Sequence, residues 1–311
     1  MDPHLLRTFV AVLEHRSFST AASVLGYTQP AVSQHIAALE ADLGARLVER
    51  RPVAPTEAGV RLMEHAPALL LRLDAARADI ARLHRAPDAR LTLACSPAAF
   101  GPALAQALAR LRAAGPVEVG LHVLGRDAVV EAVLTGRAGL GLVDGVAAPS
   151  DPLPLPDLGP TVTLAVTEEP LAVLFPHDHP LARRSSVRLP DLAQAQWIDA
   201  PDTAVPLTRL REVSHTPGFH PRIHHHGTDP HALAALAAAG HGLTALPLSL
   251  AATFPGTTAI PVHAPRLVHR TELLHPADPP PHAARLTAFL TGRAESAVRG
   301  PGPHHVERRR T

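Results

Sequence analysis

A group of amide, hydroxyl and imidazole side chains is concentrated at the start of one predicted helix, near residue 30. Glutamine and serine side chains can hydrogen-bond the edges of DNA bases, and hydroxyl groups can bind phosphate oxygens. The exposed N–H groups of a helix N-terminus also attract phosphate. We therefore expect this helix start to face the major groove of DNA, through Gln29, Pro30, Ser33, Gln34 and His35.

Two short helices joined by a tight turn would position these side chains. The first, over residues 19–25, ends at Gly26, because glycine breaks a helical pattern. Thr28 is a suitable N-cap for the second helix, and Pro30 falls in its first turn, where no backbone N–H is needed. The second helix then carries one buried stripe, formed by Val32, Ile36, Leu39 and Leu43.

This helix–turn–helix pattern has two interpretations. It is typical of DNA-reading domains, but the same periodicity fits a plain helical hairpin with a solvated outer face. Residues 1–60 hold five arginines and six acidic residues, a balance of −1, so the basic surface usual in DNA-binding domains is absent. Composition and spacing by themselves leave both interpretations open.

Several motifs in register decide between them: "LRTFVAV" (6–12), "TQPAVS" (28–33) and "TEAG" (56–59) resemble the winged helix-turn-helix of LysR-type transcriptional regulators. The resemblance implies that the second helix is the recognition helix, that residues 46–56 contain the wing, and that the partner is double-stranded promoter DNA. The wing is shorter than usual and lacks an additional basic residue. The implied DNA-binding residues are Ser19, Thr28, Gln29, Pro30, Ser33, Gln34, His35, Arg50 and Arg51.

A long helix is predicted after the wing, from residue 56 to about 83. Apolar residues recur along it at spacings of four and three, which is a heptad seam, although Pro67 should loosen its first part. The helix could pack within its own domain, but it resembles the LysR linker helix, which pairs with a partner. We expect a homodimer, or a dimer of dimers, with Leu62, Leu69, Leu73, Ile80 and Leu83 at the dimer interface.

Beyond a hinge at residues 84–90, predicted strands and helices alternate. Such alternation indicates an open, mainly parallel sheet. Expected strands lie at 91–95, 117–124, 140–143, 161–167, 171–175, 197–199, 243–246 and 266–275. Expected helices lie at 102–113, 128–134, 205–213, 230–239 and 282–292.

This second region also resembles the LysR family, through "EEPLAVLFPHDHPLA" (168–182) and "AALAAAGHGLTALP" (234–247). The resemblance implies a two-lobed effector-binding domain whose fold is like that of periplasmic solute-binding proteins. The expected fold is therefore α/β, with an N-terminal all-α winged helix-turn-helix and a long linker helix. The expected boundaries are 1–60 for the DNA-binding domain, 61–89 for the linker and hinge, 90–293 for the effector domain (lobe I 90–160 and 266–292, lobe II 161–265) and 294–311 for a disordered tail.

A small-molecule effector is expected in the cleft between these lobes, near strand ends and helix starts. The residues expected to bind it are Ser96, Pro97, Ala98, Arg126, Asp199, Ala200, Thr228 and Asp229. The guanidinium of Arg126 could hold a carboxylate in a bidentate pair, which favours a small organic acid or another compact polar metabolite. Alternatively, Arg126 points to solvent or pairs near Asp127.

Other functions have weaker support in the sequence. Histidines at 177 and 179 and at 224–226 suggest a metal site, but the "PHDHPL" stretch fits a structural motif of the family, and we expect neither metal nor cofactor. No coherent set of catalytic motifs is present, so we expect no enzyme. Cys95 is the single cysteine, which excludes an intramolecular disulfide switch. Neither a membrane span nor a signal peptide is indicated, so we expect a cytoplasmic protein.

Overall fold

The computed structural model describes residues 1–82, 90–155 and 161–292. Contacts within the chain divide it into two units, Met1–Leu83 and His84–Thr311, and each unit is described by itself. Leu83, most of the expected hinge and the expected tail at 294–311 lie outside the described residues.

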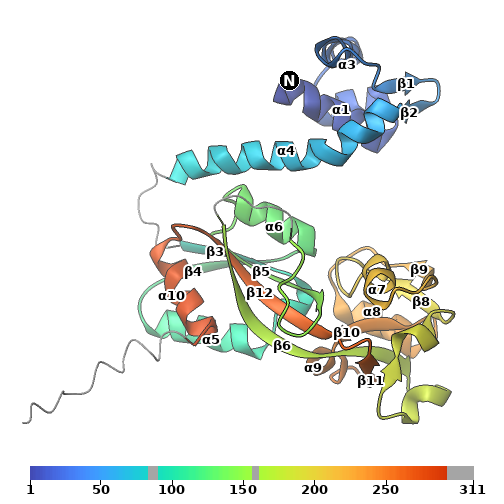
Figure 1. The fold of residues 1–311 in the computed structure, drawn as a ribbon. Coiled ribbons are helices and arrows are strands. Elements are labelled where there is room, and N and C mark those ends of the chain that lie inside the picture. Colours follow the sequence, from blue (N-terminus) through green and yellow to red (C-terminus); the bar gives the residue numbers. More distant parts are fainter. Residues whose placement is uncertain (83–89, 156–160, 293–311) are drawn as a thin grey trace, which may run out of the picture. The chain divides into compact units, whose positions relative to one another are not determined.

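The N-terminal unit is built from helices and one short hairpin (Figure 1). Its elements are α1 (Pro3–His15), α2 (Phe18–Leu25), α3 (Gln29–Leu43), β1 (Val48–Arg50), β2 (Val53–Pro55) and α4 (Glu57–Arg82). The side chains of Asp2, Ser17 and Thr28 cap the first turns of α1, α2 and α3. Gly26 and Gly44 end α2 and α3 with positive φ angles, so the turn between α2 and α3 has its expected place.

One core holds the three helices and the hairpin together. Phe9 and Val12 of α1 belong to the same buried cluster as Ile36 and Leu39 of α3. The buried stripe of α3 is shorter than expected, because Leu43 is 42% exposed at the last helical residue. The core therefore fixes most of α3. Val32 is the first buried apolar side chain of this helix, so the residues before it lie outside the core.

Two hydrogen bonds position the hairpin beside α3. The carboxylate of Glu40 accepts hydrogen bonds from the backbone N–H groups of Leu47 and Val48, at 2.8 and 3.2 Å. A Cβ atom at Gly59 would lie 2.0 Å from the carbonyl oxygen of Leu47, so a side chain at position 59 would force the start of α4 away from the hairpin. A glycine at this position is needed for close packing.

The second unit contains two lobes that share one long mixed sheet (Figure 1). The elements of the first lobe are β3 (Arg90–Cys95), η1 (Pro97–Ala99), α5 (Pro102–Ala113), β4 (Glu118–Val123), α6 (Arg126–Leu134), β5 (Leu140–Ala147), β12 (Val268–Pro276) and α10 (Pro281–Leu290). Those of the second lobe are η2 (Pro180–Arg183), β7 (Val187–Arg188), η3 (Leu189–Leu192), β8 (Gln196–Asp199), α7 (Leu207–Ser214), β9 (His220–His224), α8 (Pro230–Ala238), β10 (Thr244–Pro247), α9 (Leu248–Ala251) and β11 (Thr257–Ala264).

The expectation of a mainly parallel sheet is wrong. The strand order is β4-β3-β5-β12-β6-β11-β7, where β6 is Thr161–Pro176. Strand β10 also pairs with β6. The pairs of β3 with β4 and β5 are parallel, but β12 lies between β5 and β6 and is antiparallel to both. The returning strand was expected, but its direction was not, because alternating helices and strands do not indicate where a late strand inserts.

A single strand, β6 (Thr161–Pro176), replaces the two strands expected at 161–167 and 171–175. Its first part, as far as Pro170, pairs with β12, and its second part, from Leu171, pairs with β10 and β11. The polar residues Glu168 and Glu169 suggested a break, but they lie where the strand passes from one lobe to the other and is exposed. Residues 161–170 thus pair within the first lobe, in contrast to the boundary expected at 161.

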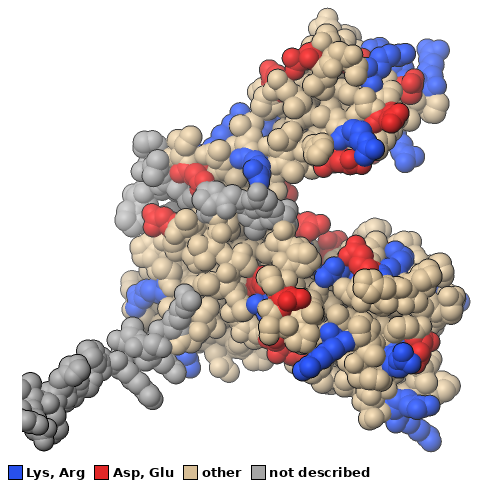
Figure 2. Space-filling model, viewed as in Figure 1, with Lys and Arg blue, Asp and Glu red and all other residues tan. Residues whose placement is uncertain are grey.

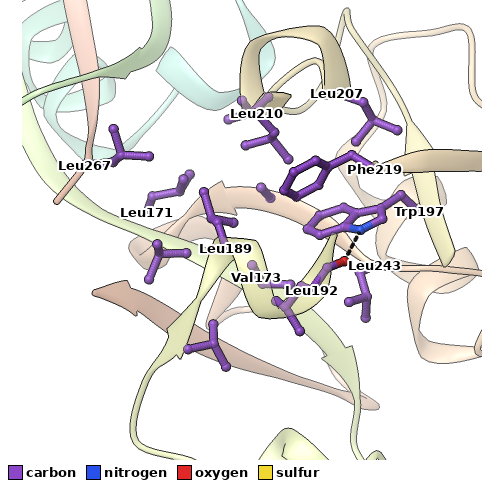
Figure 3. Packing of buried hydrophobic residues seen from close by; sticks show 14 of the residues in the cluster. Leu171, Val173, Leu189, Leu192, Trp197, Leu207, Leu210, Phe219, Leu243 and Leu267 are labelled. Carbon is purple, nitrogen blue, oxygen red and sulfur yellow. Dashed lines mark hydrogen bonds between the residues drawn. The ribbon is translucent and has the colours of Figure 1, made fainter. Parts of the chain in front are cut away.

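Each lobe has its own hydrophobic core. In the first, α5 and α10 cover the sheet face that carries Leu93, Leu142 and Leu273. In the second, Trp197 is fully buried beside Phe219, with ring centroids 5.3 Å apart, and its indole N–H donates to the carbonyl oxygen of Leu192 at 2.9 Å (Figure 3). These cores hold the loops that meet between the lobes.

Candidate DNA-binding surface and interlobe cleft

The first turn of α3 presents polar side chains on the surface of the N-terminal unit. Gln29, Pro30 and Gln34 are exposed, Ser33 is partly exposed, and Thr28 accepts the hydrogen bond of Ala31 N–H at 3.4 Å. Ser19 is exposed at the start of α2, where its hydroxyl lies 3.0 Å from that of Ser17. The helix start therefore offers the amide and hydroxyl groups that base edges require.

His35 differs from the other residues of this group. Its Nδ1 atom lies 3.0 Å from the hydroxyl oxygen of Thr8 in α1, and its ring meets that of Tyr27 edge-on at 5.1 Å. These contacts direct His35 toward its own domain. In the free protein this side chain helps to fix α3 on α1, a role that its place at the helix start did not indicate.

The wing carries two of the predicted basic residues. Arg50 and Arg51 are exposed at the end of β1, and the guanidinium of Arg50 lies 5.7 Å from the centre of the Phe18 ring. Figure 2 shows basic side chains, interspersed with acidic ones, around the part of the N-terminal unit that carries β1 and β2. The wing places positive charge beside α2, within reach of a phosphate backbone.

The apolar seam of α4 divides into two parts. Leu62 is partly buried against the core of the N-terminal unit, and Ala66 is fully buried there. Leu69 and Ile80 are 43% and 61% exposed, and Leu73 is partly buried. Arg7 of α1 pairs with Asp74 at 2.5 Å on another side of α4. The seam available to a partner therefore begins at Leu69.

A cleft opens between the two lobes of the second unit. Its volume is about 20 Å³, which is little more than a water molecule needs. From the first lobe it is lined by Ser96, Arg126, Asp144, Gly145 and Val146; from the second, by Pro201, Asp202, Thr203, Ala204, Val205, Pro206 and Arg209. Two arginines from opposite lobes thus line one cleft.

Arg126 lines this cleft and is partly exposed. Its Nη2 atom donates to the carbonyl oxygen of Pro154 at 3.2 Å, and a Cβ atom at Gly145 would lie 2.7 Å from Nη1. Burial lowers the pKa of Arg126, and the nearby carboxylates of Asp144 and Asp127 oppose this effect. The result is a partly desolvated cation that would gain from an additional anionic partner.

Asp144 forms the fixed acidic part of the cleft. Its Oδ2 atom lies 2.8 Å from Nε2 of His269, which is 2% exposed. Burial alone would raise the pKa of Asp144, but the hydrogen bonds and charges of His269, Ser96 and Arg126 together hold it below its usual value. The carboxylate is therefore ionised and held on several sides.

The structure separates the predicted effector residues into two groups. Ser96 and Arg126 line the cleft, whereas Pro97, Ala98, Asp199, Ala200, Thr228 and Asp229 are not among its lining residues. Asp199 instead caps α7 through the N–H of Leu207 at 3.2 Å, and Asp229 caps α8 through the N–H of His231 at 2.9 Å. The start of α8 was predicted correctly. The carboxylates of Asp199, at the end of β8, and of Asp229 both accept hydrogen bonds from backbone N–H groups at helix starts.

One further expectation for the cleft is wrong in detail. Ala200 is fully buried in a core cluster of the second lobe, and the loop that follows it lines the cleft in its place. After Ser96 the chain forms the three-residue 3₁₀ turn η1, and α5 begins at Pro102, as expected.

Sequence reasoning missed Asp144, Asp202 and Arg209. An acid inside the apolar stretch "LGLVDG" was a usable signal for Asp144, because a buried carboxylate needs partners. Arg209 lies in the first turns of α7, where its Nη2 atom reaches the carbonyl oxygen of Val146 in the other lobe at 3.2 Å. That contact depends on how the lobes meet, which no local pattern shows.

Among the described residues, no cluster of three or more histidine, cysteine, aspartate or glutamate side chains has the geometry to hold a metal ion. In the same residues, every helix is too short or too polar to cross a membrane.

Comparison with known proteins adds an independent observation. The family described as bacterial regulatory helix-turn-helix proteins of the lysR family matches residues 3–60, and the LysR substrate binding domain matches residues 84–295. This chain belongs to the LysR family. Its two matched regions correspond to the two units of the structure, apart from the segment that contains most of α4.

Curated relatives of this LysR-family chain are bacterial regulators. An uncharacterised helix-turn-helix regulator, YnfL of Escherichia coli K12, is 32% identical over 197 residues, which are 62% of this chain and 63% of YnfL. The small neutral protease regulatory protein of Streptomyces coelicolor is 30% identical over 242 residues, 77% of this chain and 71% of the relative. The alignments to YnfL, CysL and YbhD span only 59–63% of those relatives' lengths.

Solved LysR-family structures share the fold. Full-length BenM has a TM-score of 0.53 at 23% identity, covering 98% of this chain and 100% of BenM. Full-length CbnR in a target-DNA complex has a TM-score of 0.51 at 22% identity, covering 94% and 100%. At these identities the likeness extends to the fold alone.

Proposed function

We propose that this chain is a transcriptional regulator that binds double-stranded promoter DNA and whose DNA binding responds to a small organic anion. One observation supports this most directly: the same chain carries a helix start with exposed amide and hydroxyl groups and a cleft with two arginines from opposite lobes. The first arrangement suits base edges and the second suits a carboxylate. Neither of these interactions requires a catalytic group.

The DNA-binding part is residues 1–60, with α3 in the major groove and the wing on the phosphate backbone. The exposed Gln29 and Gln34 supply amide groups that suit adenine edges. Arg50 and Arg51 supply the charge for phosphate contacts. The related CbnR was crystallised with its target DNA, which supports a DNA-bound state for this fold.

The regulator acts as a homodimer, or a dimer of dimers, in the cytoplasm beside DNA. Residues 61–89 form the linker, and the exposed Leu69 and Ile80 of α4 are the apolar surface that a second copy covers. A two-fold dimer presents two α3 helices to two half-sites, which offsets the weak positive charge of one domain.

The effector domain spans residues 90–293, and its cleft takes a small organic acid. Arg126 and Arg209 provide donors from both lobes, and the pKa of Arg126 is lowered by burial, so an added carboxylate would stabilise its charged form. A cleft of about 20 Å³ has to widen to admit such a ligand. Binding therefore changes the relative position of the lobes, which provides the signal to DNA.

A thermal-shift titration with acetate, succinate and citrate at constant ionic strength tests this ligand class. We expect at least one acid to raise the melting temperature of wild type and to lose most of that effect in Arg126→Ala. Arg137→Ala is the matched control, because Arg137 is exposed and paired with Glu131 at 2.6 Å. Equal stabilisation of all three proteins would exclude Arg126 as the carboxylate ligand.

A second measurement connects the cleft to DNA. Fluorescence anisotropy on the promoter region of the chain's own gene should give a different affinity with and without the stabilising acid. The Arg126→Ala variant should bind the DNA but show no response to the acid. Failure of wild type to bind any promoter fragment specifically would contradict the regulatory function itself.

A further inference from the structure

The carboxylate of Asp202 is placed across the entrance of the interlobe cleft. Asp202 belongs to the loop after β8 in the second lobe, and Gly125 is the residue before α6 in the first. A Cβ atom at Gly125 would lie 2.0 Å from Oδ1 of Asp202 and 2.8 Å from its Cγ. The carboxylate therefore rests directly on the backbone of Gly125, in a space that any side chain there would fill.

The conformation of Gly125 shows what the glycine is needed for. Its φ and ψ angles are −60° and 155°, values that every residue adopts easily. Backbone strain thus does not require glycine here. The absence of a side chain instead leaves room for the carboxylate of Asp202. This carboxylate also places a negative charge beside the N-terminus of α6, which has no side-chain cap of its own.

The two acids that line the cleft differ in how they are held. Asp144 is bound to the buried His269 at 2.8 Å. Asp202 is exposed, and within the described residues no side-chain hydrogen bond ties it to its own lobe. Of the two carboxylates that line the cleft, Asp202 is therefore the less firmly held.

We propose that Asp202 is an interlobe latch that occupies the place of the ligand's carboxylate: it closes the cleft when no ligand is bound and competes with an anionic ligand when one arrives. The claim that Asp202 competes with an anionic ligand rests on the proposed function. The claim that Asp202 holds the two lobes together does not. Arg209, which reaches the carbonyl oxygen of Val146, is a second contact between the lobes and stays in place when Asp202 leaves.

Two variants remove the latch by different means. Asp202→Asn keeps the shape of the side chain and removes its charge. Gly125→Ala keeps the charge of Asp202 and fills the space that its carboxylate occupies. Asp178→Asn is the matched control, because Asp178 is an exposed acid of the second lobe that does not line the cleft. If the latch exists, the first two variants share one phenotype, their double variant adds nothing further, and the control behaves as wild type.

The latch is measured without ligand, through the distance between spin labels on the two lobes of the full-length protein. Labels at Ala103→Cys in α5 and Ala235→Cys in α8, in a Cys95→Ala background and diluted with unlabelled chain, report this distance. We expect a longer or broader distribution for Asp202→Asn and Gly125→Ala than for the labelled parent. Distributions identical to that of the parent in both variants would overturn the latch.

The competition is measured with succinate, by thermal-shift titration at constant ionic strength. We expect the succinate concentration at half effect to fall at least about threefold in both variants and to stay unchanged in Asp178→Asn. An equal fall in the control would show a general charge effect and overturn the competition. If succinate stabilises none of the proteins, the competition with this acid is overturned, while the label distances still decide the latch.

Discussion

At the residue scale, the same side chain has different tasks according to its partners. Arg270 is 11% exposed and is paired with the carboxylates of Glu168 and Glu272, the latter at 2.6 Å. Its charge is balanced within the first lobe. Arg126 is bound to a backbone carbonyl and is desolvated, so its charge is balanced less completely. Burial with incomplete pairing, more than residue type, is what favours Arg126 as the proposed ligand-binding group.

A prediction about DNA reading belongs to Gln34. Replacing Gln34 by alanine removes one exposed amide from the first turns of α3, and loss of a bidentate base contact costs about 1–3 kcal/mol. We expect a roughly 5- to 150-fold weaker affinity for the promoter in a gel-shift titration. Gln106→Ala, on an exposed face of α5, is the control and should leave the affinity unchanged. Unchanged binding by Gln34→Ala would remove this residue from the interface.

A prediction about pH concerns Cys95. Burial, together with the charge of Asp144, raises the pKa of its thiol to about 11. Because this pKa lies above that of an unfolded thiol, about 8.5, the buried neutral form contributes stability that is complete below pH 8.5 and is lost as pH rises through 11. At pH 8 we expect dithionitrobenzoate to react at least about 100-fold more slowly with native protein than with urea-unfolded protein. Similar rates would contradict the buried, protonated thiol.

At the element scale, the sequence predicted the helices and strands that local patterns specify. It failed where pairing with another element determines the structure. The bounds of α5 at 102–113 followed from its apolar period and Pro102 in the first turn. Strand β11 required knowledge of pairing, because it runs through "TTAIPVHA", a segment with a proline inside, whereas the second part of β6 was expected at 171–175. Ser96 and Arg126 were found because they follow strand ends, whereas Asp202 depends on a loop from the other lobe.

The exposed seam of α4 gives a prediction about assembly. Leu69→Glu combined with Leu73→Glu places like charges opposite each other across a two-fold axis, which is strongly unfavourable. We expect monomers by light scattering and loss of operator protection in footprinting. The control places glutamates at Ala68 and Ala81, exposed positions of α4 outside the seam, and should remain dimeric. A double variant at the seam that stays dimeric would require another interface.

At the scale of the whole molecule, the two units have separate cores. Phe9 is fully buried in the N-terminal unit, and Trp197, the single tryptophan, is fully buried in the second lobe of the other unit. Tryptophan fluorescence therefore reports the unfolding of the effector domain alone. This arrangement allows the stability of one unit to be changed without the other.

The variant Phe9→Ala tests this independence. Truncating a fully buried phenylalanine costs about 3–5 kcal/mol, which is a large share of the stability of so small a domain. We expect circular dichroism to show an early loss of helix, while the fluorescence midpoint of Trp197 stays at its wild-type temperature. Phe219→Ala, beside the tryptophan ring, should do the reverse. A common shift of both signals in Phe9→Ala would show that the units unfold together.

The continuity of β6 has a mechanical consequence. One uninterrupted strand belongs to both lobes, so the lobes are not joined at that point by a freely jointed tether. Turning one lobe against the other twists this strand about its own axis, and the hydrogen bonds on either side resist the torsion. We therefore expect the domain to behave as a torsion spring, with small rotations of the lobes that reverse when a ligand leaves.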